Sequence, residues 1–158
     1  MNPEIHLHRK LDTLKLKHFL HRHEIAFAFF ESDAYVIKEF SDRKSIDHLI
    51  DEMISAESMF GTMGANVLRW GRNQLAKVEG RYHERVCIIM SDLGFFDIPK
   101  VAAEIQMLKQ MDTKVIIILP PAFIYRSSLD VIGKAGCTVI ELDGENIARF
   151  PEIIGEVI

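Results

Sequence analysis

Three largely apolar runs in the second half of the chain, each separated from the next by an amphipathic stretch, set the strongest limit on the fold. The runs lie at residues 86–90, 115–119 and 137–142. Between them, apolar residues recur every three or four positions, as on one face of a helix, and the second stretch ends at Gly133 or Gly136. Strands that are apolar throughout have both faces covered, and helices between them supply that cover. The pattern therefore predicts an α/β fold: a doubly wound, mostly parallel, Rossmann-like sheet with helices on both faces.

The first half adds two strands, at residues 25–30 and 34–37. Only residues 31–33 separate them, too few for a crossover helix, so the two strands must form an antiparallel hairpin. The second strand alternates between polar and apolar residues, as an edge strand does. Apolar residues at helical spacing predict further helices at residues 7–20, at 46–54 and in the segment after Gly64.

Composition narrows the class of protein. The 158 residues contain no linker or low-complexity tract, which predicts a single domain over residues 1–158. Nineteen basic against 23 acidic residues give a net charge of −4, so no basic field attracts nucleic acid. No apolar run is long enough to span a bilayer, and the first residues lack an apolar signal core, so we expect a cytoplasmic protein without membrane contact. Cys87 and Cys137 lack the CxxC spacing of a redox motif.

Polar groups occur in two segments near the expected crevice of the sheet. Ser91 and Asp92 directly follow the run at residues 86–90, while Gly61 and Thr62 directly precede a helix. The carboxyl ends of parallel strands open into one crevice, and hydroxyl and carboxylate oxygens are the ligands that Mg²⁺ or Mn²⁺ takes. A simpler interpretation is that Thr62 caps its helix and Asp92 caps the next one. These residues alone do not decide between a metal site and helix caps.

The order of these features resembles that of a von Willebrand factor type A domain. The similar stretches are residues 25–37 (IAFAFFESDAYVI), 61–70 (GTMGANVLRW) and 86–93 (VCIIMSDL). The resemblance extends over roughly residues 15–158. It implies a metal-ion-dependent adhesion site, built in that family from an Asp-x-Ser-x-Ser motif, a threonine in a Gly-Thr loop and an aspartate after the fourth strand. Thr62 and Asp92 match the last two.

The Asp-x-Ser-x-Ser motif and the strand that carries it are missing. Only the expected helix at residues 7–20 precedes the hairpin, so Thr62 and Asp92 form an incomplete, degenerate site that binds a divalent cation weakly if at all. In the family that strand is the centre of the sheet, and its loss leaves backbone groups of both neighbours unpaired. Four arrangements would compensate for the missing strand. The hairpin pairs directly with the strand at residues 86–90, or another chain donates a strand. Alternatively, a second copy of the chain pairs at the sheet edge, or a preceding part of a larger type A domain contains the missing strand. We favour closure of the sheet together with self-association into a homo-oligomer.

The resemblance implies a protein-interaction module rather than an enzyme. No serine has a histidine at hydrolase spacing, and no GxGxxG or P-loop motif is present. An enzyme of another type would have Asp92, Asp97 and Glu31 as its carboxylate candidates. We expect an unidentified protein partner to bind the face at the carboxyl ends of the strands, formed by Gly61, Thr62, Ser91, Asp92, Pro120 and Pro121.

A degenerate response-regulator receiver domain is the alternative. The segments IIMSDLGFFD, KVIIILPP and GKAGCTVIELDG resemble the last three strand–helix units of a receiver, which would make Asp92 a phosphate acceptor. Pro120 and Pro121 occupy the place of the receiver's hydroxyl residue, and residues 142–144 replace the region of its lysine. Phosphate on Asp92 would therefore lack its charge partners. The hairpin also has no place in a receiver.

Overall fold

A three-stranded parallel sheet forms the centre of the molecule. The computed structural model describes residues 24–30, 33–40, 48, 63–81, 84–121 and 124–157. The sheet contains β3 (Arg85–Met90), β4 (Thr113–Leu119) and β5 (Thr138–Glu141) in the order β3-β4-β5, and both ladders are parallel. In β4, residues 115–119 are all buried, as a strand covered on both faces requires. The three predicted strands are confirmed.

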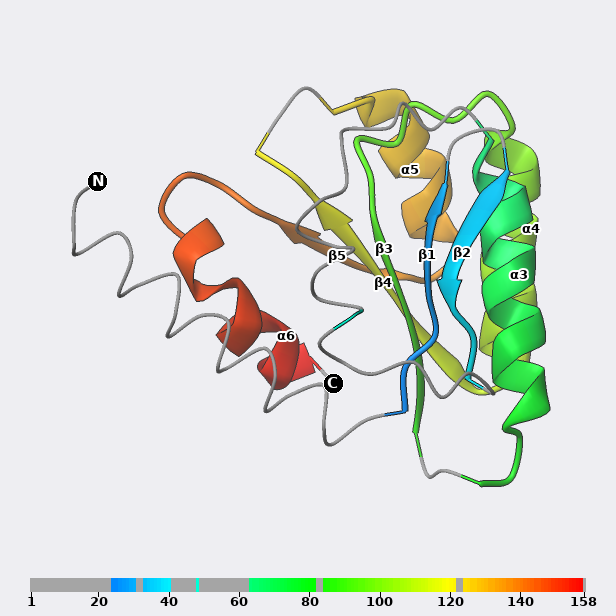
Figure 1. Ribbon diagram of the computed structural model, residues 1–158. Helices are drawn as coiled ribbons and strands as arrows, with labels where there is room; N and C mark the ends of the chain where they lie inside the picture. The colour runs from blue at the N-terminus through cyan, green and yellow to red at the C-terminus, as the bar shows by residue number, and fades with distance from the viewer. Residues whose placement is uncertain are drawn as a thin grey trace.

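Helices cover both faces of this sheet (Figure 1). On one side lie α3 (Gly64–Lys77), α4 (Ile98–Gln110) and α5 (Arg126–Lys134). On the other side lies α6 (Phe150–Val157), which follows a short 3-10 turn, η1 (Ile147–Arg149). The doubly wound α/β architecture predicted from the sequence is therefore confirmed.

The end of α5 distinguishes the two glycines that the sequence offered as stop signals. Gly133 lies inside the helix, whereas Gly136 follows the C-cap residue Ala135 with a φ of +91°. Glycine reaches this left-handed conformation without the steric cost that a Cβ imposes. Gly136 therefore marks the point at which the chain leaves the helix.

The hairpin consists of β1 (Phe27–Phe30) and β2 (Ala34–Lys38), which pair antiparallel as predicted. Within the described ranges no backbone ladder joins it to β3, so the expected direct pairing with the strand at residues 86–90 is not observed there. A side chain joins the hairpin to the core, because the ring of Phe30 packs against the ring of Phe95, in the loop after β3, with centroids 6.0 Å apart. Tyr35 and Val36 are both exposed, so β2 departs from strict alternation.

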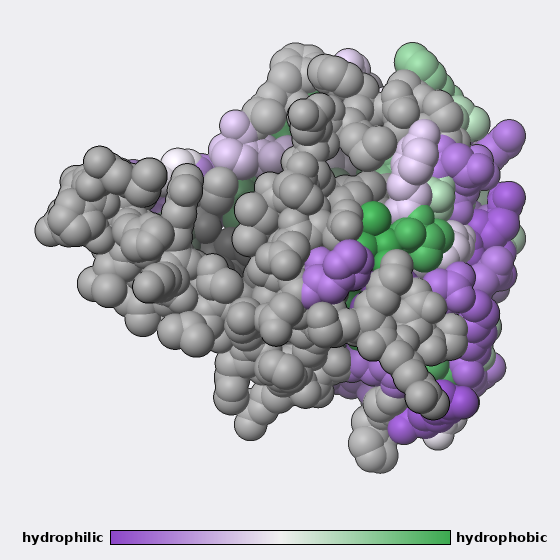
Figure 2. Space-filling view, viewed as in Figure 1, coloured by the Kyte–Doolittle hydropathy of each residue, from purple (hydrophilic) through white to green (hydrophobic). Residues whose placement is uncertain are grey.

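The hydropathy of the surface differs between the side formed by α3 and the hairpin. Hydrophilic residues dominate the side of the molecule formed by α3, and a compact hydrophobic patch lies where the hairpin is exposed (Figure 2). Of the hairpin residues, Val36 contributes exposed apolar surface. A strand whose two successive residues both reach solvent is typical of the edge of a sheet.

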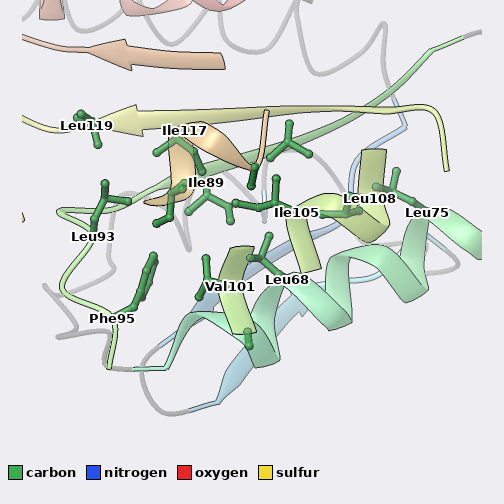
Figure 3. Close-up of a cluster of buried hydrophobic side chains, with 14 residues drawn as sticks. Leu68, Leu75, Ile89, Leu93, Phe95, Val101, Ile105, Leu108, Ile117 and Leu119 are labelled. Atoms are coloured by element: carbon green, nitrogen blue, oxygen red, sulfur yellow. The ribbon is translucent and has the colours of Figure 1, made fainter. Parts of the chain in front are cut away.

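Each face of the parallel sheet has its own core. The register pairs Ile88 with Ile116 and Ile89 with Ile117. Because successive residues of a strand point to opposite faces, the first pair faces one side of the sheet and the second pair faces the other. The larger cluster packs β3 and β4 against α3, α4 and α5 (Figure 3). The smaller cluster joins Ile116 to α6. Val86 of β3 also packs against this cluster, but the later residues Ile88 and Met90 on that side are 40% and 49% exposed.

Two predicted helices lie outside the described residues. The helix expected at residues 7–20 falls wholly outside, and of residues 46–54 only His48 is described, in helical conformation. Among the helices that are described, none combines the length and the apolar character needed to cross a membrane.

Candidate binding site at the carboxyl ends of the strands

The carboxyl ends of the three parallel strands meet at one edge of the sheet. The Ser91 N–H, just after β3, donates a hydrogen bond to the Ile118 carbonyl of β4 at 3.1 Å. The Leu142 N–H, just after β5, donates to the Leu119 carbonyl at 2.9 Å. The structure therefore brings the Ser91–Asp92 segment to the edge where β4 continues into Pro120 and Pro121, as predicted. The other two predicted site residues, Gly61 and Thr62, lie outside the described residues.

The loop after β3 is held by its own polar side chains. Ser91 Oγ accepts a hydrogen bond from the Leu93 N–H at 3.0 Å, and Asp92 Oδ1 accepts one from the Gly94 N–H at 2.9 Å. Leu93 is fully buried with a φ of +66°, a strained conformation for a branched side chain. The two side-chain acceptors stabilise this turn. Asp92 therefore shapes the loop and does not cap the next helix, because the N-cap residue of α4 is Asp97.

Two aromatic side chains are exposed in this region: Tyr125 lies beside the loop, and Phe96 belongs to it. The Tyr125 N–H donates to the Asp92 carbonyl at 3.0 Å, which draws the start of α5 to the loop. A Cβ built on Gly94 would lie 2.9 Å from Tyr125 Cε2 and 3.2 Å from Asp92 Oδ1, so the ring and the carboxylate both lie beside Gly94, which has no side chain to separate them. Tyr125 is 47% exposed and Phe96 is 83% exposed. The site is therefore an exposed carboxylate with aromatic surface beside it.

Sequence reasoning missed both aromatic residues. The helical spacing of Tyr125 with Leu129 and Ile132 predicts that Tyr125 faces the core, and no sequence pattern singles out Phe96. One signal was available: Phe95 and Phe96 are consecutive, and two neighbouring side chains in an irregular segment rarely both face the same core. The structure buries Phe95 and exposes Phe96.

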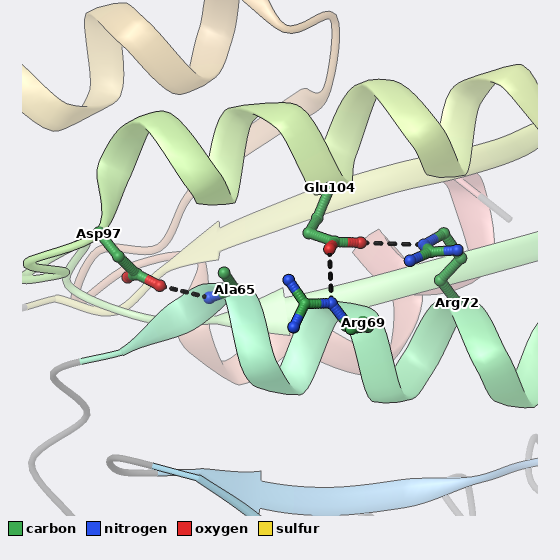
Figure 4. A network of polar contacts seen from close by, with 5 residues as sticks. All are labelled: Ala65, Arg69, Arg72, Asp97 and Glu104. Carbon is green, nitrogen blue, oxygen red and sulfur yellow. Dashed lines mark hydrogen bonds and ion pairs between the residues drawn. The ribbon is translucent and has the colours of Figure 1, made fainter.

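The free backbone N–H groups at the beginning of α3 form hydrogen bonds with a carboxylate at the N-cap of α4. Asp97 accepts hydrogen bonds from the Gly64 N–H at 2.9 Å and the Ala65 N–H at 3.0 Å (Figure 4 draws the second). The N-cap residue of α3 is Met63, which makes no side-chain cap bond, so Thr62 is not the N-cap and that interpretation is wrong. Free N–H groups at a helix start attract negative charge, and the buried Asp97 supplies it.

A divalent cation does not fit the polar groups that the structure describes here. Both oxygens of Asp97 accept hydrogen bonds from backbone N–H groups of α3. Ser91 Oγ and Asp92 Oδ1 accept hydrogen bonds from backbone N–H groups of the loop. Across the described ranges, no cluster of three or more His, Cys, Asp or Glu residues is placed to hold a metal. Of the two predicted metal ligands, only Asp92 is described, and one carboxylate provides too few ligands for Mg²⁺ or Mn²⁺.

An ion pair occupies the β5 side of the same edge. Arg126 Nη1 and Nη2 donate to the two carboxylate oxygens of Glu141 at 2.6 Å and 3.1 Å. These hydrogen bonds lower the pKa of Glu141 and raise the pKa of Arg126 from their ordinary values. The guanidinium of Arg126 is thus committed to Glu141. Within the described part of the chain, no lysine or arginine pairs with Asp92.

The receiver-like alternative gains no support from this geometry. Pro120 follows β4 where a receiver needs a hydroxyl, and β5 leads into Leu142 and Asp143 where it needs a lysine. Asp143 Oδ1 accepts hydrogen bonds from the N–H groups of Glu145 and Asn146, which makes this segment a turn. The observed antiparallel hairpin likewise has no counterpart in a receiver.

Comparison with known proteins supports the fold class. No protein-family model matches the sequence, and no curated protein does. Among solved structures, the chain is similar to the manganese-loaded TRAP protein of Plasmodium vivax, with a TM-score of 0.63 and 16% sequence identity over 80% of this chain. The match spans 55% of the TRAP chain, about half its length. At this identity the likeness shows the fold alone, which is von Willebrand factor type A-like.

Proposed function

We propose that the chain is a non-enzymatic protein-interaction module that binds a protein partner through its strand-end face. This face comprises Ser91, Asp92, Phe96, Pro120, Pro121 and Tyr125, and by the resemblance also Gly61 and Thr62. The observation that carries the proposal is the exposed Tyr125 ring near the Asp92 carboxylate, with the exposed Phe96 four residues further along the same loop. Exposed aromatic residues next to polar groups are enriched at protein interfaces, where they anchor the partner.

A binding role also agrees with how the reactive groups are used. The Ser91 hydroxyl and both Asp97 oxygens are engaged with backbone N–H groups. Burial raises the pKa of the Cys87 thiol to about 12, so the thiolate needed for nucleophilic attack is not formed near neutral pH. These groups support the fold and leave the exposed surface for recognition.

Affinity capture with matched variants tests the proposal. The double variant Phe96→Ser/Tyr125→Ser removes aromatic surface from the strand-end face, while Met107→Ser/Val131→Ser removes exposed apolar side chains from α4 and α5. We expect a partner from the native cell extract to be retained by the wild-type chain and the control but lost from the first variant. Equal retention by all three chains would overturn the proposal. Circular dichroism checks that each variant is folded.

We further propose that partner binding does not require Mg²⁺ or Mn²⁺. In intact members of the resembled family, the metal offers an open position to a partner's carboxylate. The described oxygens here do not form such a ligand set, so a metal would need donors from elsewhere. Binding of the captured partner should be unchanged in EDTA. Loss of binding in EDTA, restored by Mn²⁺, would show that another segment or chain completes the site.

Self-association through β3 is a second proposal. It is supported by the exposure of Ile88 and Met90 and by the pairing of β3, among the described strands, with β4 alone. An apolar strand at a sheet edge favours pairing with a second copy. Light scattering after size exclusion should give a dimer or larger species for the wild-type chain and a smaller mass for Ile88→Ser/Met90→Ser. A wild-type monomer would exclude this proposal.

A further inference from the structure

We infer that the partner segment bound at the strand-end face presents an arginine side chain to Asp92. The inference rests on the proposed function and specifies the chemistry of the partner. It reverses the charge expected from the resembled family, in which a bound metal receives a carboxylate. Among the described residues no ligand set fits a metal, so we take the exposed Asp92 carboxylate itself as the recognition group, and a carboxylate attracts a cation.

The carboxylate is held in position before any partner arrives. Its Oδ1 accepts the Gly94 N–H at 2.9 Å, while the Asp92 carbonyl accepts the Tyr125 N–H at 3.0 Å. These two contacts fix the acid relative to β3 and α5. A preorganised acceptor loses little conformational freedom when it binds, which favours affinity.

The surrounding charges also favour a cation. The nearest arginine on α5, Arg126, is already paired with Glu141. The loop after β5 adds Asp143 and Glu145, both exposed, to the same edge of the sheet. An incoming carboxylate would meet like charges here, whereas a cationic side chain is attracted to Asp92.

The aromatic surface selects arginine over lysine. The Tyr125 ring and Asp92 Oδ1 both lie close to Gly94, 2.9 Å and 3.2 Å from the position that a Cβ would take, so the ring and the carboxylate are near each other. A planar guanidinium stacks on an aromatic ring and donates to a carboxylate at the same time, which a compact ammonium group does less well. Phe96, which is more exposed than Tyr125, provides an apolar contact for the neighbouring residue of the partner. The preferred segment is therefore an arginine next to a large apolar residue.

Fluorescence polarisation with four labelled hexapeptides tests this inference. The peptides share a leucine and differ at the next position, which is arginine, citrulline, lysine or glutamate. Citrulline keeps the shape of arginine but is neutral. With the full chain we expect the arginine peptide to bind, the citrulline and glutamate peptides to bind at least tenfold more weakly, and the lysine peptide to be intermediate. Affinity should fall as salt rises, since screening weakens exposed charge pairs.

Variants of the chain show whether Asp92 is responsible. Asp92→Asn keeps an oxygen that accepts the Gly94 N–H, so the loop is preserved while the charge is lost. This variant should bind the arginine peptide at least tenfold more weakly than the wild-type chain does, while its affinity for the citrulline peptide should be unchanged. The matched control is Asp112→Asn, an exposed aspartate at the opposite end of β4 whose left-handed φ of 55° asparagine accepts. The control should bind all four peptides as the wild-type chain does.

The outcomes separate this inference from the proposed function. Equal binding of the arginine and citrulline peptides, tighter binding of the glutamate peptide in Mg²⁺, or no binding of any peptide at millimolar concentration would overturn the inference. If the captured partner is nevertheless lost from Phe96→Ser/Tyr125→Ser and retained by Asp92→Asn, the strand-end face still binds a partner of other chemistry. If it is retained by both variants, the proposed function fails as well.

Discussion

Two aspartates five positions apart, Asp92 and Asp97, have opposite roles in this molecule. Asp97 is buried at the junction of α3 and α4, where both of its oxygens accept N–H groups of α3. Asp92 is exposed at the strand ends, where only Oδ1 has a described partner, the Gly94 N–H. A carboxylate that is desolvated must be fully hydrogen-bonded, whereas an exposed one retains water and can exchange it for a ligand. The first therefore serves stability and the second is available for binding.

The α3–α4 junction contains a second buried acid of the same kind. Glu104 on α4 is 4% exposed, and its two oxygens accept from Arg69 Nε and Arg72 Nε of α3, each at 2.9 Å (Figure 4). The strand-end face has exposed groups and short-range turn contacts instead. Substitutions at the junction should therefore reduce stability, and substitutions at the strand-end face should mainly reduce binding.

The largest expected loss of stability comes from Asp97→Ala. It leaves the buried N–H groups of Gly64 and Ala65 without an acceptor and removes a negative charge from the start of α3. We expect the free energy of unfolding to fall by about 2–3 kcal/mol in urea denaturation. Asp92→Ala is the matched comparison. It should lower the free energy of unfolding by about 0.5 kcal/mol, as is usual for an exposed residue. Similar losses for both variants would contradict the contrast drawn between the two regions.

Gly64→Ala should destabilise the same junction by steric overlap. A Cβ at Gly64 would lie 2.8 Å from Val101 Cγ2 and 2.9 Å from Phe95 Cδ1, and both of these side chains are buried. Overpacking of this kind costs about 1–2 kcal/mol, measurable as a lower urea midpoint. Gly133→Ala in α5 is the control, because nothing lies within 4 Å of its Cβ position. It should raise stability by about 0.5 kcal/mol, since alanine favours a helix interior.

Glu104→Gln should have a smaller effect. Glutamine keeps the shape of the side chain but loses the charge that faces two arginines. Both arginine side chains reach solvent, at 52% for Arg69 and 26% for Arg72, so water offsets part of the lost attraction. We expect a loss of about 1 kcal/mol in urea denaturation. If Arg69→Gln combined with Glu104→Gln were as destabilising as the sum of the single variants, the two side chains would not be coupled.

The smallest effect concerns the exposed pair of Arg126 and Glu141. Arg126 lowers the pKa of Glu141 in the folded chain, so the pair contributes stability above the unfolded pKa of Glu141 and loses it as pH falls through the lowered folded value. Arg126→Ala should return the pKa of Glu141 toward its ordinary value. A carbon-detected NMR titration of the Glu141 carboxyl measures this shift. An unchanged titration curve would mean that the pair does not persist in solution.

Among the described residues, the sequence alone determined the strands, their direction and the positions of α3, α4 and α5, whereas α6 was not predicted. Continuous apolar runs such as residues 115–119 specify a doubly covered strand by local composition, and the three residues between β1 and β2 permit only an antiparallel hairpin. The polar residues after β3 were also placed correctly, because every parallel strand ends at the same edge. These features follow from residues that are close together in the chain.

Only the tertiary structure decided which side chains meet. Asp97 reaches the start of α3 across 33 positions, and the ring of Tyr125 comes to rest beside Gly94. Such contacts depend on the angle at which helices cross and on the path of each loop, to which residues throughout the core contribute. A local pattern contains little of that information, so the sequence predicted Asp92 as a candidate site residue but not the exposed Tyr125 ring that lies near it. The same physical reason explains why two nearby aspartates look equivalent in the sequence and differ in the folded chain.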